Sequence, residues 1–143
     1  MGGLPRGSMK AHLTRRYWFV ASHRLHTPRL SEAENREVYG KCNNPFGHGH
    51  NYALEVTVGG QVAPDTGMVY NLADVDRVVR KHILERYDHQ NLNCLKEFQE
   101  LVPTTENLCL AIFEILKRNL AEIHLDKVRL EETSQNSFEV VNE

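Results

Sequence analysis

Two histidines separated by a single residue, His48 and His50, are the first feature of this sequence that could do chemistry. Residues two apart on a strand point to the same side, so an extended backbone would aim both imidazoles at one metal ion. His23, at the end of an earlier apolar segment, could add a third nitrogen. Three nitrogen ligands with one open position are typical of catalytic zinc. The alternative is a chance pair in a chain that contains eight histidines.

A cysteine lies close enough in sequence to take part in the same site. Cys42 precedes His48 by six residues, on a turn-rich segment. A thiol near a divalent cation ionises readily, so Cys42 could act as a base or as a metal ligand. The alternative is a small buried side chain, which is also our expectation for Cys94 and Cys109.

Two further positions carry candidate polar chemistry. Asp88 directly precedes His89, and an acid beside an imidazole can set its tautomer and raise its basicity if the backbone folds the two side chains together. Glu132, near the end of a predicted strand, could accept paired hydrogen bonds from a guanidine-like edge. A solvated charge on a strand is the alternative for Glu132.

Composition predicts an ordinary globular domain and argues against several partners. The chain has 143 residues, and its 17 Lys plus Arg against 19 Asp plus Glu give a net charge of -2 with no basic run, so nucleic acid is not an expected partner. No apolar run is long enough to span a membrane. Three cysteines without CxxC spacing favour a reducing, cytoplasmic location. Residues 1–9 partly resemble an expression-tag remnant or a flexible start, which leaves 10–143 as one domain.

Hydrophobic periodicity predicts the elements that would have to position these residues. Alternating segments indicate strands and segments of helical spacing indicate helices that are apolar on one side. The order predicts an α+β domain, ββααββ, with two long helices packed on one face of a four-stranded antiparallel sheet. Strands are predicted at 12–21, 48–58, 127–133 and 138–141, a short helix at 31–39, and long helices at 74–86 and 103–118.

Six short motifs also occur along the chain in a definite order. They are Ala21-Ser22-His23-Arg24-Leu25, Gly40-Lys41-Cys42-Asn43-Asn44-Pro45, Gly47-His48-Gly49-His50-Asn51-Tyr52, Gly67-Met68-Val69 with Asn71-Leu72-Ala73-Asp74, Asp88-His89 with Asn91-Leu92, and Thr104-Thr105-Glu106-Asn107. Together they resemble the family of 6-pyruvoyltetrahydropterin and 6-carboxytetrahydropterin synthases. The resemblance extends from about Arg15 to Thr133.

The resemblance implies an assembly as well as a fold. It implies a tunnelling fold, in which the sheets of three subunits join into a barrel. Two such trimers would stack into a homohexamer, and the active sites would lie at subunit interfaces.

The resemblance also implies a reaction and a set of residue roles. The substrate would be the pterin 7,8-dihydroneopterin triphosphate, whose side-chain hydroxyls bind zinc, which acidifies the adjoining positions. A thiolate moves protons, triphosphate is eliminated and the ring is reduced internally, so no external redox cofactor is needed. Carried over by position, the Zn²⁺ ligands are His23, His48 and His50, the base is Cys42, the proton relay is Asp88 with His89, Glu132 grips the pterin, and Thr104, Thr105 and Glu106 line its pocket.

Two departures from the family pattern stand out. Ser134-Gln135-Asn136 follows Thr133 where the animal enzymes usually carry an acid and two asparagines, and Trp18 replaces a small residue. The first departure bears on the pterin anchor and leaves the three histidines unaffected.

Two other functions compete with 6-pyruvoyltetrahydropterin formation, which serves tetrahydrobiopterin biosynthesis. Bacterial relatives form 6-carboxytetrahydropterin for queuosine and other deazapurines, and they would also release acetaldehyde. Their cysteine usually lies closer to the HGH motif, so the five residues between Cys42 and His48 favour the pyruvoyl product. A non-catalytic metal-binding assembly module is the third reading, and the presence of Cys42, Asp88 and His89 together argues against it.

Overall fold

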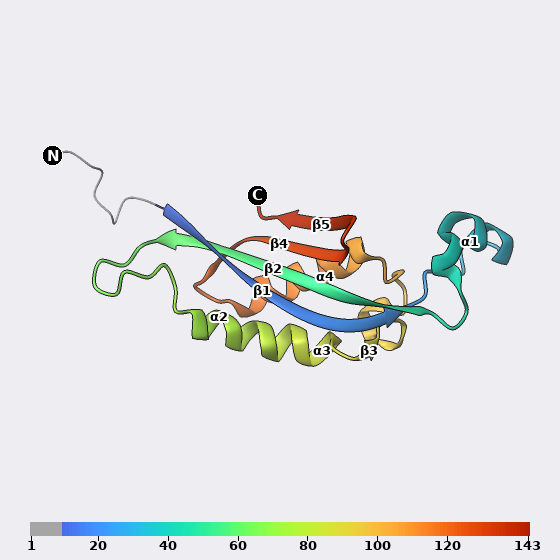
Figure 1. Ribbon diagram of the computed structural model, residues 1–143, viewed down its shortest axis with the longest axis horizontal. Coiled ribbons are helices and arrows are strands. Elements are labelled where there is room, and N and C mark those ends of the chain that lie inside the picture. The colour runs from blue at the N-terminus through green and yellow to red at the C-terminus, as the bar shows by residue number, and fades with distance from the viewer. Residues whose placement is uncertain (1–9) are drawn as a thin grey trace.

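The computed structural model describes residues 10–143, and the predicted tag remnant at 1–9 lies outside the described residues. One long, twisted sheet with strand order β3-β1-β2-β4-β5 forms one layer of the described chain, and helices cover one of its faces (Figure 1). The α+β prediction is confirmed. The strands are β1 (Lys10–His23), β2 (His48–Gln61), β3 (Gln90–Asn91), β4 (His124–Thr133) and β5 (Asn136–Val141).

The sheet contains one strand that periodicity did not predict. The four predicted strands pair antiparallel, as expected, and their order in the sheet is β1-β2-β4-β5. β3 adds a parallel edge to β1 through two residue pairs, Ala21 with Gln90 and Ser22 with Asn91. Two residues are too few to show an alternating pattern, so a strand of this length leaves no signal in the sequence.

The helices occupy two different places. α1 (Glu32–Tyr39) lies beyond one end of the sheet, whereas α2 (Leu72–Val79), α3 (Glu85–Tyr87) and α4 (Thr105–Asn119) pack beneath it (Figure 1). A π-helical turn joins α2 to α3, so the predicted helix 74–86 is one nearly continuous helix that begins earlier. Asn71 accounts for that earlier start, because its side chain accepts a hydrogen bond from the Ala73 N–H at 2.9 Å.

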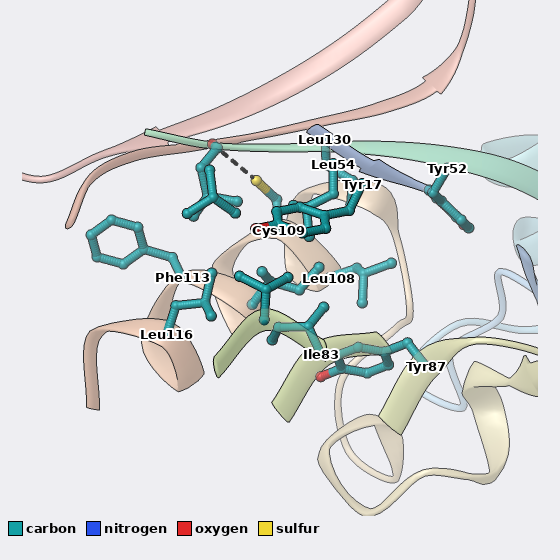
Figure 2. Packing of buried hydrophobic residues seen from close by; sticks show 14 of the residues in the cluster. Tyr17, Tyr52, Leu54, Ile83, Tyr87, Leu108, Cys109, Phe113, Leu116 and Leu130 are labelled. Carbon is teal, nitrogen blue, oxygen red and sulfur yellow. Dashed lines mark hydrogen bonds between the residues drawn. The ribbon is translucent and has the colours of Figure 1, made fainter. Parts of the chain in front are cut away.

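The core lies between the sheet and these helices. Leu54, Ile83, Leu108 and Leu130 have no exposed surface and come from β2, the π-helical turn, α4 and β4 (Figure 2). Burial of this apolar surface is the main force that holds the helices to the sheet. In residues 10–143 no helix is long and apolar enough to cross a bilayer.

All three cysteines are free, but they lie in different environments. Cys109 is buried in the core as predicted, with its Sγ 3.6 Å from the Val128 carbonyl oxygen, and burial raises its pKa to about 12. Cys94 is exposed, so the prediction of a buried side chain is wrong there. Cys94 ends a short 3₁₀ turn that buries Leu92 and leaves the cysteine outside.

A polar cluster fixes the segment that follows α3. The Arg86 guanidinium donates two hydrogen bonds to Glu97, both at 2.7 Å, and the Tyr87 hydroxyl donates a third at 2.6 Å. These bonds lower the pKa of Glu97 to about 2. The cluster therefore ties the end of the long helix to the connection that leads toward α4.

We predict that Glu97→Gln destabilises the protein at neutral pH by about 1–2 kcal/mol, because the charge-assisted bonds are lost. Glu97 has a lower pKa folded than unfolded, so its contribution is complete above the unfolded pKa of about 4.3 and disappears as the pH falls toward 2. Urea denaturation at several pH values would show the difference between wild type and variant shrinking below about pH 4. Glu100→Gln, at an exposed position without an ion pair in the described chain, is the control, and an equal loss there would contradict the prediction.

Candidate metal centre

The pairing of β1 with β2 brings the three predicted metal-binding histidines to one place. His23 lies directly opposite His48, and Ala21 lies opposite His50. Paired residues of antiparallel strands share a face, and so do residues two apart on one strand. All three imidazoles therefore lie on the face that the helices cover, where His23 is 1% exposed.

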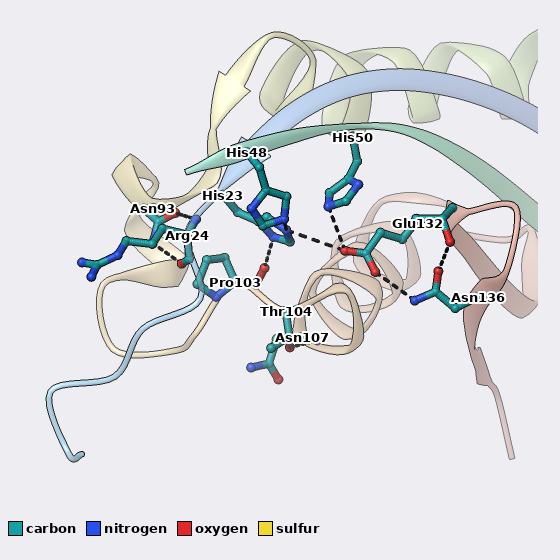
Figure 3. Close-up of polar contacts among 11 residues, drawn as sticks. His23, Arg24, His48, His50, Asn93, Pro103, Thr104, Asn107, Glu132 and Asn136 are labelled. Carbon is teal, nitrogen blue, oxygen red and sulfur yellow. Dashed lines mark hydrogen bonds and ion pairs between the residues drawn. The ribbon is translucent and has the colours of Figure 1, made fainter. Parts of the chain in front are cut away.

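The ligand atoms of these histidines and of Glu132 have the spacing of a metal site. The Nε2 atoms of His23 and His48 are 3.1 Å apart, and Glu132 Oε1 lies 3.1 Å from His50 Nε2 and 3.6 Å from His23 Nε2. All four ligand atoms lie within 4.8 Å of one another (Figure 3). A tetrahedron with bonds of about 2.0–2.1 Å would place ligand atoms about 3.3–3.4 Å apart, so the group fits a single zinc-sized ion.

Hydrogen bonding leaves the ring nitrogens ready to bind a cation. His23 Nδ1 donates to the Pro103 carbonyl oxygen at 2.7 Å, which leaves Nε2 as the lone-pair nitrogen. His50 Nε2 is buried and forms no hydrogen bond in the described chain, since its approach to Glu132 lacks hydrogen-bond geometry. Burial lowers the pKa of both His23 and His50, which keeps them neutral. The observation that makes a metal fit is the unpartnered His50 Nε2, which lies beside Glu132 and next to the His23 and His48 Nε2 atoms.

The backbone that orients His23 is fixed by the start of α4. The Thr104 side chain caps this helix by accepting from the Asn107 N–H at 3.1 Å, and the Asn107 side chain donates to the Val102 carbonyl at 2.8 Å. These two bonds hold the turn that contains Pro103. The contact is made by a backbone oxygen 80 residues away in the sequence, so no residue type predicted it.

Glu132, predicted to grip a pterin, lies among the imidazoles. Its Oε1 points toward His23 and His50, while its Oε2 accepts a hydrogen bond from Asn136 Nδ2 at 3.1 Å (Figure 3). Sequence reasoning missed Asn136 as a partner, although the unusual Ser134-Gln135-Asn136 turn marked this position.

Hydrogen bonds hold the backbone at Cys42 against the residues that follow His23. The Leu25 N–H donates to the Cys42 carbonyl at 2.8 Å, and the Asn43 side chain returns a bond to the Leu25 carbonyl at 2.7 Å. The thiol is half-buried, and burial followed by the charge of Glu132 raises its pKa. The protein groups alone favour the neutral thiol, and the ionisation predicted for Cys42 is that of a thiol beside a divalent cation.

Asp88 and His89 form the predicted pair, which has no polar contact with the metal-facing group among the described residues. Their Oδ1 and Nδ1 atoms are 3.1 Å apart, and Val20 of β1 binds the backbone of His89 and the side chain of Asp88. The His89 side chain is 79% exposed. Within residues 10–143, neither hydrogen bonds nor ion pairs connect this pair to Cys42 or to the three histidines.

The three residues predicted to line the pterin pocket have different surroundings. Thr104 caps α4, Glu106 is exposed, and Thr105 is buried with a hydroxyl that has no hydrogen-bond partner in the described chain. The Tyr52 hydroxyl is likewise buried without a partner, and its ring lies 5.6 Å from that of His50. Sequence reasoning did not select Tyr52 as a site residue, although it follows His50 by two positions and so shares its face of β2.

The chain is similar to known proteins of one family. The family model described as 6-pyruvoyl tetrahydropterin synthase matches residues 12–143. A 6-pyruvoyl tetrahydrobiopterin synthase from Poecilia reticulata is 45% identical over 94% of this chain and 92% of the relative. The solved 6-pyruvoyl tetrahydropterin synthase of Caenorhabditis elegans is 40% identical, with a TM-score of 0.89 over 94% of this chain and 97% of that one. A putative 6-carboxy-5,6,7,8-tetrahydropterin synthase from Archaeoglobus fulgidus is 35% identical over 78% of this chain and 88% of the relative.

We predict that His50→Ala weakens metal binding by more than the roughly 10–100-fold that loss of an outer-shell partner costs, because a ligand itself is lost. Competition with a chromophoric chelator would measure the affinity for Zn²⁺. His124→Ala, at the opposite end of the sheet beside Asp126, is the matched control and should bind as wild type does. Equal affinity of wild type and His50→Ala would exclude the site.

Proposed function

The chain belongs to the 6-pyruvoyl tetrahydropterin synthase family, and we propose that it converts 7,8-dihydroneopterin triphosphate to 6-pyruvoyltetrahydropterin with elimination of triphosphate. The observation that carries this proposal is the convergence of His23, His48 and His50 on one point, with Cys42 held by a backbone hydrogen bond to Leu25, just after His23. A lyase activity of this kind needs a site that binds oxygen atoms of the substrate and a group that moves protons nearby.

Zn²⁺ is the proposed metal. Three imidazoles with an oxygen donor form a ligand set typical of catalytic zinc. A bound Zn²⁺ would polarise the side-chain oxygens of the substrate and favour loss of protons from the adjoining carbons. The protein's own part is to hold His23 in one tautomer through Pro103 and to present the Cys42 thiol for proton transfer.

The proton relay is proposed to act across a subunit boundary. Asp88 and His89 lie on the β3 side of β1 and make no polar contact with Cys42 in the described chain, and the His89 ring is largely exposed. The pair can still serve a site on a neighbouring copy. A homohexamer built from two trimers would bring it there, in keeping with the family resemblance.

The sheet has an uncovered face and an open edge that such an assembly would use. Helices cover one face only, and Trp18 and Val20 on the outer face of β1 are 65% and 42% exposed (Figure 1). β1 is paired on its outer side by just the two residues of β3, so most of its edge is free for another strand within the described chain.

The 6-carboxy product is the second candidate, supported by the Archaeoglobus fulgidus relative. The distance in sequence between Cys42 and His48 favours the pyruvoyl product, as do the 45% identical relatives of that name. Mass spectrometry of the products from dihydroneopterin triphosphate would separate the two, because the carboxy route also releases acetaldehyde. Failure to consume the substrate with Zn²⁺ bound would refute both activities.

The role of Cys42 leads to a second test of the same reaction. Cys42→Ala should retain the metal, since the imidazoles do not depend on the thiol, while turnover falls by about 10²–10⁴-fold, the usual worth of a positioned general base. Cys94→Ala, which changes an exposed cysteine, should keep full turnover and is the control. Loss of metal from Cys42→Ala would identify Cys42 as a ligand instead.

We predict that a mixture of two inactive variants regains activity. Light scattering should give a hexamer, and Cys42→Ala and His89→Ala subunits unfolded and refolded together should form some sites with both residues intact. The recovered turnover should approach one quarter of wild type for random assembly, because each shared site draws one residue from each of two subunits. Recovery no greater than the sum of the separately refolded variants would show that one chain supplies both groups.

A further inference from the structure

Glu132 is placed to bind a metal and is expected to anchor a pterin, and its carboxylate cannot do both at the same time. Oε1 lies 3.1 Å from His50 Nε2 and 3.6 Å from His23 Nε2, which is where a fourth metal ligand would stand. A pterin anchor, however, needs both carboxylate oxygens for the paired donors of the ring edge. Asn136 already occupies Oε2. The carboxylate as the structure places it is therefore arranged for a metal rather than for a ring.

Alternation along β4 turns the Glu132 side chain toward the metal side, because Leu130, two residues earlier, is buried in the core. The pairing of β4 with β5 is regular up to Glu131 with Ser137 and shifts before Thr133 with Asn136. Glu132 has no partner of its own between these pairs, which makes it the extra residue of a bulge. The bulge therefore leaves the Glu132 backbone outside the β4–β5 ladder, and bulges are frequent beside active sites.

We propose that Glu132 is the fourth protein ligand of the resting metal and that it leaves the metal when the ring edge of a pterin binds to it. The proposal rests on the proposed function, which supplies the pterin. Binding of the ring then opens the metal position that the hydroxyls of the substrate side chain require. The three imidazoles keep the metal in place throughout, because each is held independently of Glu132 by the strands.

Asn136 has a specific part in this exchange. It holds Oε2 while Oε1 faces the imidazoles, and its own side-chain oxygen is contacted by the Thr133 hydroxyl across the turn. The contact orients the amide so that its nitrogen faces Glu132. Release of Oε2 by Asn136 and of Oε1 by the metal gives the ring edge a free pair of acceptor oxygens.

The test uses Co²⁺ in place of Zn²⁺, because the visible spectrum of Co²⁺ reports its ligand set without turnover. The added probe is 2-amino-4-hydroxypteridine, which has the pterin ring edge but no side-chain hydroxyls to bind the metal. Wild-type protein should change its Co²⁺ spectrum when the probe binds, and the final spectrum should approach that of Glu132→Gln alone. Probe binding is followed separately by quenching of its own fluorescence.

Glu131→Gln is the matched control. Glu131 is the preceding residue and also an acid, but it pairs with Arg129 on the outer face of the sheet, 3.6 Å away. Its variant should repeat both wild-type spectra, whereas Glu132→Gln should show no probe-dependent change and should bind Co²⁺ roughly tenfold or more weakly. Circular dichroism of both variants verifies that the fold is kept.

Two results would overturn the exchange. One is a wild-type spectrum identical to that of Glu132→Gln before any probe is added. The other is a wild-type spectrum that stays unchanged although probe fluorescence shows that binding is saturated. Failure of the probe to bind at all counts as the same result. A protein that forms the pyruvoyl product without a spectral change would refute the exchange alone, and one that shows the change but forms no product would refute the proposed function alone.

Discussion

The register between β1 and β2 is the constraint on which the site depends. Fourteen consecutive pairs join the strands, and the last of them sets His23 against His48. A slip of one residue would turn every side chain of one strand to the opposite face, which would separate the imidazoles and expose Tyr17 and Phe19 together. The apolar alternation that fills the core therefore also fixes the metal ligands, and the same sequence pattern specifies both.

The core also sets the chemistry of the ligands. Phe19 stacks on Tyr52 with ring centroids 5.0 Å apart, and the Tyr52 ring lies 6.5 Å from that of His23. The apolar surroundings of the imidazoles penalise charge and lower the pKa of His23 and His50, so these two side chains stay neutral and present lone pairs. An acid in the same group is tolerated because Asn136 binds one of its oxygens and the imidazoles face the other. The position of the site beside the hydrophobic core thus increases its affinity for a cation, because the core keeps these ring nitrogens unprotonated.

The sequence predicted the parts of this arrangement that follow from periodicity and residue type. Four strands, the long helices and the meeting of His23, His48 and His50 follow from alternation, since strand faces are determined by it. The inward face of Glu132 follows from the same alternation, since Leu130 two residues earlier is buried, but the bulge that leaves it without a partner in β5 gave no signal in the sequence. The Pro103 carbonyl left no signal either, since every residue type offers the same backbone oxygen.

The charges of the site connect its two reactive parts. An imidazole cannot carry a negative charge at physiological pH, so Glu132 supplies the one negative charge among the four metal-facing groups. The same carboxylate, together with burial, raises the pKa of Cys42. If the Glu132 carboxylate moved toward a bound ring, its charge would neutralise less of the charge of the cation. It would also raise the pKa of the Cys42 thiol less. Movement of the Glu132 side chain would then leave the cation more strongly polarising and the thiol easier to ionise, as proton transfer requires. Both changes would occur only after the substrate ring is in place.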